Sequence, residues 1–178
     1  SACLVGSEMC IRDSYCSGSI SVIDPSTNQV IYNITVGKRP TDIAYDPSNG
    51  YIYVTHSCFC CVSVINPSTN QVIDTINVRE GAVSITYDPN NGYIYVTNYR
   101  SDSVSVIDPS TNSVIATIKV GGCRGSITYD PSNGYIYVTN GCCVSVIDPS
   151  TNSVIATIKV RGGPLGITYD PSNGYIYV

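Results

Sequence analysis

Cysteine thiols are the side chains of this chain with the widest chemistry, since a thiol can form a disulfide, bind a metal ion or act as a nucleophile. The 178 residues include nine cysteines. The pairs Cys60-Cys61 and Cys142-Cys143 both stand directly before the letters Val-Ser-Val-Ile. This regularity indicates that the thiols occupy equivalent places in a repeated structure. The candidates for disulfide bonds are Cys16, Cys58, Cys60, Cys61, Cys123, Cys142 and Cys143.

Three uses of these thiols compete. Disulfides come first, since each one stabilises a small oxidised protein by about 2–4 kcal/mol. A metal-thiolate site comes second, because Cys58-x-Cys60-Cys61 is not a regular CxxC pair and the one histidine, His56, is near Cys58 only in sequence. Free thiols are the third use. Nine is an odd number, so at least one thiol has no partner within the chain, which favours cross-links between chains. Adjacent cysteines of an extended chain point to opposite sides, so we expect Cys142 and Cys143 to serve different partners.

The carboxylates follow a pattern of their own, because most aspartates stand directly before a proline. Asp-Pro is typical of a tight turn, in which the carboxylate accepts hydrogen bonds from the local backbone. The alternative is a calcium-binding rim made of repeated Asp, Asn and Ser oxygens. General acid-base or nucleophilic catalysis needs a positioned base and partner, and no such set is visible. We therefore predict no enzyme activity and no cofactor, with calcium as the alternative. The aspartates are Asp24, Asp46, Asp88, Asp108, Asp130, Asp148 and Asp170.

The elements that position these groups repeat along the chain. The phrase Asp-Pro-Ser-Thr-Asn begins at residues 24, 108 and 148, with an Asn-Pro version at 66. A second phrase, Tyr-Asp-Pro-(Ser/Asn)-Asn-Gly-Tyr-Ile-Tyr-Val, begins at 45, 87, 129 and 169. Both phrases recur at the same spacing, so each unit is one copy of a supersecondary element.

One unit contains four short runs rich in Val, Ile, Thr and Tyr, at 83–87, 93–97, 104–107 and 114–119. Residues of these types in short runs predict strands. The Asp-Pro segments between them predict hairpin turns. No helical period is present. A unit of about 40 residues with four antiparallel strands is typical of one propeller blade, so the sequence predicts an all-β, β-propeller-type array of about four blades.

The repeats begin with the third strand of a blade and stop after the second. We predict a half blade at 19–37, three blades at 38–78, 79–120 and 121–160, and a half blade at 161–178. Residues 1–18 do not follow the repeat. Residues 5–14 resemble the translation of a sequencing-library adapter, in which case this segment is an assembly artefact, and we base no function on it.

The two half blades complement each other. They could join within one chain as a four-bladed ring, or pair with neighbouring copies as a head-to-tail polymer. A third alternative is that the chain is a piece of a longer propeller. The polymer is favoured, because the cysteines suggest links between chains. The residues predicted to pair are Ile20, Val22, Ile31 and Ile34 in the first half and Ile167, Tyr169, Ile176 and Val178 in the second.

The segments Tyr95-Val96-Thr97-Asn98 and Tyr137-Val138-Thr139-Asn140 each come shortly before Val-Ser-Val-Ile-Asp-Pro. On these motifs, residues 19–178 resemble the YVTN family of β-propeller repeats. That resemblance implies an extracellular or cell-surface setting, because the family is associated with surface-layer and secreted proteins of archaea and bacteria. Members usually carry about seven blades, and this chain departs from that number.

The remaining features narrow the function. The net charge is −4 and the nine basic residues are scattered along the chain, so the sequence predicts no basic surface for binding nucleic acid. No stretch is long enough to span a membrane. Asn33-Ile34-Thr35 is a candidate site for glycan attachment at Asn33. We predict a non-enzymatic extracellular structural protein that assembles into a filament, tube or surface layer through half blades and disulfides. The alternatives are a monomeric adhesion or ligand-binding propeller and, in a third class, a metal or redox enzyme that uses the cysteines.

Overall fold

The computed structural model describes residues 9–10 and 18–178, and within these ranges it consists of strands and turns without any helix. Three four-stranded antiparallel sheets follow one another along the chain, each in simple sequence order. The all-β prediction, with four-stranded antiparallel units, is confirmed. The first sheet is β4 (Pro40–Asp46), β5 (Tyr51–His56), β6 (Cys61–Asn66) and β7 (Gln71–Asn77), the second is β8 (Ala82–Tyr87), β9 (Ile94–Asn98), β10 (Ser103–Asp108) and β11 (Ser113–Lys119), and the third is β12 (Cys123–Tyr129), β13 (Ile136–Asn140), β14 (Cys143–Asp148) and β15 (Ser153–Lys159).

The Asp-Pro turns form as the sequence predicts. In the turn between β10 and β11, Asp108 Oδ1 accepts hydrogen bonds from the backbone N–H of Ser110 at 2.8 Å and from its hydroxyl at 2.6 Å. Asn112 then takes a φ of 50°, a left-handed conformation that asparagine tolerates well. The same geometry recurs at the turns that begin with Asp24 and Asp148. These aspartates therefore act as turn caps.

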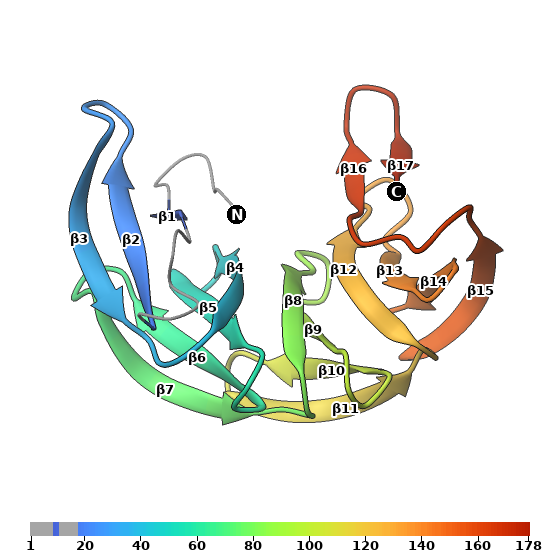
Figure 1. Ribbon diagram of the computed structural model, residues 1–178, viewed down its shortest axis with the longest axis horizontal. Helices are drawn as coiled ribbons and strands as arrows, with labels where there is room; N and C mark the ends of the chain where they lie inside the picture. The colour runs from blue at the N-terminus through green and yellow to red at the C-terminus, as the bar shows by residue number, and fades with distance from the viewer. Residues whose placement is uncertain (1–8, 11–17) are drawn as a thin grey trace.

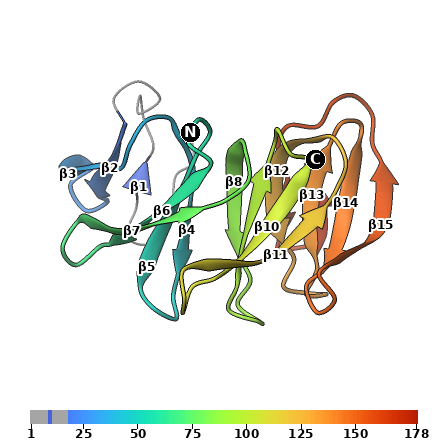
Figure 2. The ribbon, with the colours of Figure 1, turned by 90° about the horizontal axis from the view of Figure 1, so that it is seen from below.

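The three sheets stand side by side in an open arc, with β4, β8 and β12 on its inner side and β7, β11 and β15 towards its outer side (Figures 1 and 2). Apolar side chains fill the space between neighbouring sheets. Ile118 of the second sheet packs in one cluster with Ile127 and Val138 of the third. Because both faces of the middle sheet are covered, its central strands β9 and β10 are almost continuously buried, which explains why apolar and polar residues do not alternate cleanly there.

Polar side chains tie the inner strands of neighbouring sheets together. Asp42 Oδ2 on β4 accepts hydrogen bonds from Ser84 Oγ at 2.6 Å and from the backbone N–H of Ile85 at 3.0 Å, both on β8. One repeat later, Ser84 Oγ accepts a weaker bond from Ile127 N on β12 at 3.4 Å. Burial raises the pKa of Asp42, although these donors oppose the shift. One position of the repeat thus links each inner strand to the next.

Two incomplete sheets stand at the ends of the arc. β2 (Ser19–Asp24) and β3 (Gln29–Thr35) form one, and β16 (Thr168–Asp170) and β17 (Tyr175–Tyr177) form the other. They belong to separate sheets and do not pair with each other, so the described part of the chain is not a closed ring.

The ends of the chain differ from the sequence prediction in two respects. β1 (Met9–Cys10), which lies in the segment thought to be unrelated to the fold, pairs with β2 through Met9 and Val22 and through Cys10 and Ser21. Ile167 and Val178 were predicted in strands but lie outside them. β16 pairs with β17 from Thr168 opposite Tyr177 to Asp170 opposite Tyr175, so the ladder includes neither Ile167 nor Val178.

Candidate functional site

The two ends of the sheets carry different kinds of residue. At one end, called here the turn face, lie the similar Asp-Pro turns. At the other, called the loop face, lie the loops at 57–60, 99–102 and 141–142 and the connections between sheets at 36–39, 78–81 and 120–122. The loops differ in length and composition although the strands around them are nearly the same. Because the fold does not require this variation, the loop face is the candidate functional site.

The loop face holds all the predicted cysteines that the structure describes. Cys58 and Cys60 lie in the loop before β6, and Cys61 begins that strand. In the third sheet, Cys123 pairs with Asn140 on one side and Cys143 pairs with Asn140 on the other. Cys16 lies outside the described residues.

The described thiols are free. Cys58, Cys60, Cys61, Cys142 and Cys143 form no disulfide in this structure. Burial raises the pKa of the Cys61 thiol, and the neighbouring thiols of Cys60 and Cys58 raise it further.

The expectation that Cys142 and Cys143 point to opposite sides is wrong. Their Sγ atoms lie 3.9 Å apart. The reason is local, because Gly141 and Cys142 form a turn and only Cys143 is in a strand, so the alternation of an extended chain does not apply. Burial and the neighbouring Cys142 raise the pKa of Cys143, while Lys159 acts in the opposite direction.

A buried polar contact supports each loop. The last residue of the second strand is His56, Asn98 or Asn140, and each of these hydrogen-bonds to a serine of the third strand. His56 Nε2 lies 2.9 Å from Ser63 Oγ, and His56 Nδ1 lies 3.2 Å from the carbonyl oxygen of Lys38 in the preceding connection. Burial lowers the pKa of His56. Asn140 Nδ2 likewise donates to the carbonyl oxygen of Val120 in the connection before its own sheet, at 2.8 Å, so His56 takes the place of this asparagine in the first sheet.

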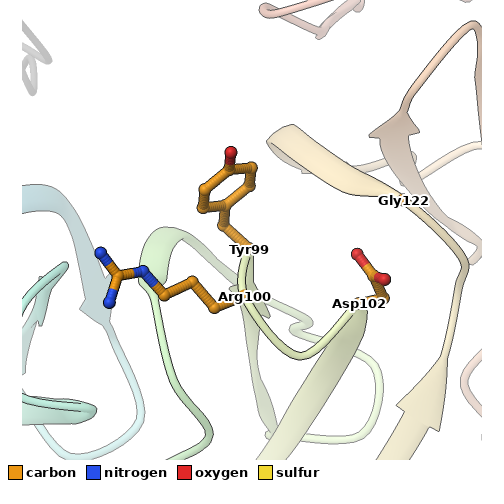
Figure 3. Close-up of a pocket in the computed structure, with 4 residues that line it drawn as sticks. All are labelled: Tyr99, Arg100, Asp102 and Gly122. Carbon is orange, nitrogen blue, oxygen red and sulfur yellow. The ribbon is translucent and has the colours of Figure 1, made fainter.

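A cavity of about 560 Å³ opens on the loop face between the second and third sheets. It is lined by Tyr99, Arg100 and Asp102 from the β9–β10 loop and by Gly122 from the next connection. Figure 3 shows the guanidinium of Arg100 pointing away from the carboxylate of Asp102, with the Tyr99 ring between them. The cavity thus offers a cation, an anion and an aromatic ring at separate points.

Backbone contacts hold this loop in place. The N–H of Tyr99 donates to the carbonyl oxygen of Gly81 at 2.8 Å, and the N–H of Arg100 donates to that of Glu80 at 3.2 Å. Gly81 has a φ of 80°, and a Cβ on it would lie 2.9 Å from Arg100 N. Only glycine fits there without a shift. Sequence reasoning missed this cavity, and the available signal was that residues 99–102 differ from the loops of the other repeats.

The other predicted site residues are spread over the molecule. Asn33 is exposed on β3, where Ser21 Oγ donates to its Oδ1 at 2.7 Å, so its side chain is accessible for a glycan. Ile20 and Ile34 are buried against the first sheet, whereas Ile31 is largely exposed.

Among the residues described, no group of three or more His, Cys, Asp or Glu side chains is arranged to hold a metal ion. The described residues form no helix, and so they include no apolar helix that could cross a membrane.

The fold defines an all-β protein made of successive four-stranded antiparallel sheets, and solved structures share this arrangement. Hydrazine synthase from Kuenenia stuttgartiensis superposes with a TM-score of 0.81 at 21% identity, over 89% of this chain and 48% of that one. A functionally unknown protein from Desulfotomaculum acetoxidans DSM 771 superposes with a TM-score of 0.70 at 17% identity, over 86% of this chain and 51% of that one. This chain therefore spans about half the length of each, and at these identities the likeness concerns the fold alone. No protein-family model and no curated protein matches the sequence.

Proposed function

We propose that the chain is a β-propeller-type structural protein of the cell surface or the extracellular space, without enzymatic activity, that assembles with copies of itself. In this proposal, β2 and β3 of one copy complete the sheet that β16 and β17 begin in the next. The four strands then form a blade like the three that one chain contains. The contact is head-to-tail, so it can extend into a filament, tube or layer.

The observation that carries the proposal is the exposure of one apolar position. Ile76 and Ile118 are 3% and 4% exposed, because the next sheet covers each of them. The equivalent Ile158 on β15 is 47% exposed. Tyr177 on β17 likewise is 50% exposed, whereas its equivalents Tyr53 and Tyr95 are fully buried. The third sheet thus leaves exposed an apolar position that a neighbouring sheet covers in the first two sheets.

The strand edges fit the same arrangement. In the first sheet, β5 and β6 pair through Ile52 with Ile65 and through Tyr53 with Val64. Moving these pairs by the repeat gives Ile176 with Ile23 and Tyr177 with Val22. β1 contacts Val22 on this edge of β2, so β1 must leave before β17 can pair. The free thiols of the loop face then supply cross-links between copies, provided that the setting is oxidising.

The test compares two substitutions on β15, measured by multi-angle light scattering over a range of protein concentrations. Ile158→Asp places a charge on the surface that the next copy must cover, so we expect it to abolish association. Ile155→Asp is the matched control, because Ile155 and its equivalents Ile73 and Ile115 are exposed in all three sheets. Equal association of both variants and the unchanged chain would refute the proposal.

A second candidate function rests on the loop-face cavity. Tyr99, Arg100 and Asp102 present complementary polar groups around about 560 Å³, which is within the usual size of a small-ligand site. A monomeric adhesion or ligand-binding propeller would use this cavity. A chain that stays monomeric at all concentrations would favour this candidate over the structural one.

A further inference from the structure

The loop between β13 and β14 is shorter than its counterparts in the other two sheets, and it ends in two adjacent cysteines. Asn140 pairs with Cys143, so Gly141 and Cys142 alone make the turn. The counterparts run over 57–60 and 99–102. Gly141 takes a φ of 46°, as a two-residue hairpin loop requires at its first central position. The short turn therefore sets the direction in which Cys142 leaves the backbone.

This turn brings two thiols together. The Sγ atoms of Cys142 and Cys143 lie 3.9 Å apart. The repeat equivalents of Cys142 are Cys60 and Asp102, which take left-handed φ angles of 53° and 47°, whereas Cys142 does not have a positive φ. Among the described residues, Cys60 and Cys61 occupy the same position of the repeat without a thiol contact of this kind. The backbone of the short turn, and not adjacency alone, thus accounts for the approach of the thiols.

Hydrogen bonds hold the backbone on both sides of the pair. The N–H of Val160 donates to the carbonyl oxygen of Cys142 at 3.1 Å, and the N–H of Gly141 donates to that of Gly122 at 2.9 Å. Cys143 is the first residue of β14 and is held in its ladder. Closing the remaining gap to an S–S bond of about 2.05 Å therefore falls mainly on rotation of the two side chains.

The surroundings favour reaction with a reagent from solvent. Cys142 is exposed and Cys143 is half-buried, so a reagent reaches Cys142 first. Burial and the neighbouring Cys142 raise the pKa of Cys143, but the ammonium of Lys159, directly opposite on β15, opposes them. The residue opposite Cys61 is Asn77, which carries no charge. Because the thiolate is the attacking form in disulfide exchange, Lys159 favours reaction at this pair.

Two adjacent thiols could serve a metal ion or an oxidant. A structural zinc site takes four ligands, of which this pair supplies only half. In the described part of the chain, no group of three or more His, Cys, Asp or Glu side chains is arranged to complete such a set. A disulfide, in contrast, needs no atom beyond the two sulfurs. The pair is therefore better suited to oxidation.

A disulfide between neighbouring residues is strained. Their Cα atoms are about 3.8 Å apart across a trans peptide, whereas a disulfide usually joins Cα atoms about 4.4–6.8 Å apart. Strained and exposed disulfides are the ones that thiols reduce most readily. The bond formed at this turn should therefore open again under mild reduction.

We propose that Cys142 and Cys143 form a reversible redox site, in which a low-molecular-weight disulfide oxidises the two thiols to a disulfide between the adjacent residues. The thiolate of Cys142 attacks one sulfur of the reagent, forms a mixed disulfide and releases the other half as a thiol. The thiolate of Cys143 then attacks the Cys142 sulfur, closes the bond and releases the second half as a thiol. The two cysteines lose two protons and two electrons, and the reagent gains them.

This reaction takes place within one chain, so it does not depend on the assembly proposed above. It leaves Cys58, Cys60 and Cys61 for cross-links between copies. A chain that stays monomeric can still close the site, and an assembled chain can lack it, so the two proposals fail separately.

The test treats the reduced full chain with oxidised glutathione in the presence of a metal chelator, blocks the remaining thiols with iodoacetamide and digests the protein with trypsin. Cleavage after Arg124 and Lys159 gives a peptide, 125–159, whose only cysteines are Cys142 and Cys143. By mass spectrometry, we expect this peptide to have lost two hydrogen atoms and to carry no adduct. Reduced glutathione should restore both thiols. A peptide that stays reduced, that carries glutathione or is linked to a second peptide, or whose disulfide resists reduced glutathione would overturn the proposal.

The variant Cys58→Ser supplies a matched control within the same sample. Its tryptic peptide 39–79 contains the adjacent Cys60 and Cys61 as its only cysteines. We expect this pair to close roughly two- to tenfold more slowly than the pair at 142–143, the effect of holding a side chain away from its preferred rotamer. Equal rates would show that adjacency alone is responsible, and would overturn the assignment of the site to the short turn.

Discussion

The histidine that replaces the motif asparagine in the first sheet predicts a dependence of stability on pH. His56 is buried and its pKa is lowered by burial, so the folded protein keeps it neutral at a pH where the unfolded chain already binds a proton. Its contribution is therefore complete above the unfolded pKa of about 6.5 and is lost as the pH falls below that value. If folded His56 stays neutral, the free energy of unfolding decreases by at most about 1.4 kcal/mol between pH 7.5 and 5.5. For a domain of this length, that loss lowers the melting temperature by about 3–6 °C.

The assay is a series of thermal melts, followed by circular dichroism at pH 7.5, 6.5 and 5.5, of the unchanged protein and of His56→Asn. Asparagine is the residue at the equivalent positions 98 and 140, so this variant keeps a side chain that the fold accepts. We expect the difference in melting temperature between the two proteins to change with pH by the amount given above. The reciprocal variant Asn98→His should acquire the same dependence. Parallel curves for the unchanged protein and His56→Asn would refute this account of the buried contact.

Two further substitutions test the contacts that hold the sheets and the loop face. Asp42→Ala removes the acceptor that binds β8, so we expect a loss of about 1–3 kcal/mol in the free energy of unfolding by urea. Asp42→Ser, which copies the residue at the next repeat, should lose less than half as much, and equal losses would contradict the proposed link between inner strands. Gly81→Ala introduces both a positive-φ strain and a clash with Arg100 N, so we expect it to lower the free energy of unfolding by about 2–4 kcal/mol. Gly92 has a similar φ but open space around it, so we expect Gly92→Ala to lower the free energy of unfolding by only about 1–2 kcal/mol. Similar losses for the two glycines would mean that the clash is relieved at no cost.

The strands and turns could be predicted from the sequence because their signals are local and repeated. The runs predicted at 83–87 and 114–119 differ from β8 and β11 by one residue at most at each end. Pro, Asx and Gly residues determine the turns between them by their own backbone preferences. Repetition strengthens these signals, because each copy reports independently on the same element.

The sites were harder to predict, because they depend on contacts between repeats. The loop-face cavity combines residues of the 99–102 loop with Gly122 of the next connection. No spacing within one repeat shows such pairs. The approach of Cys142 Sγ to Cys143 Sγ was missed for a different reason, since a turn replaced the extended chain that the reasoning assumed.

The central claim is that the half sheets at the two ends complete one another between copies. Negative-stain electron microscopy of the natively purified protein tests it most directly, because an assembled filament or layer and a single copy differ in size and regularity. The account predicts regular filaments, tubes or sheets in the unchanged protein and none in Ile158→Asp. Isolated discs in both samples would contradict it, and would make a monomeric binding protein the better description.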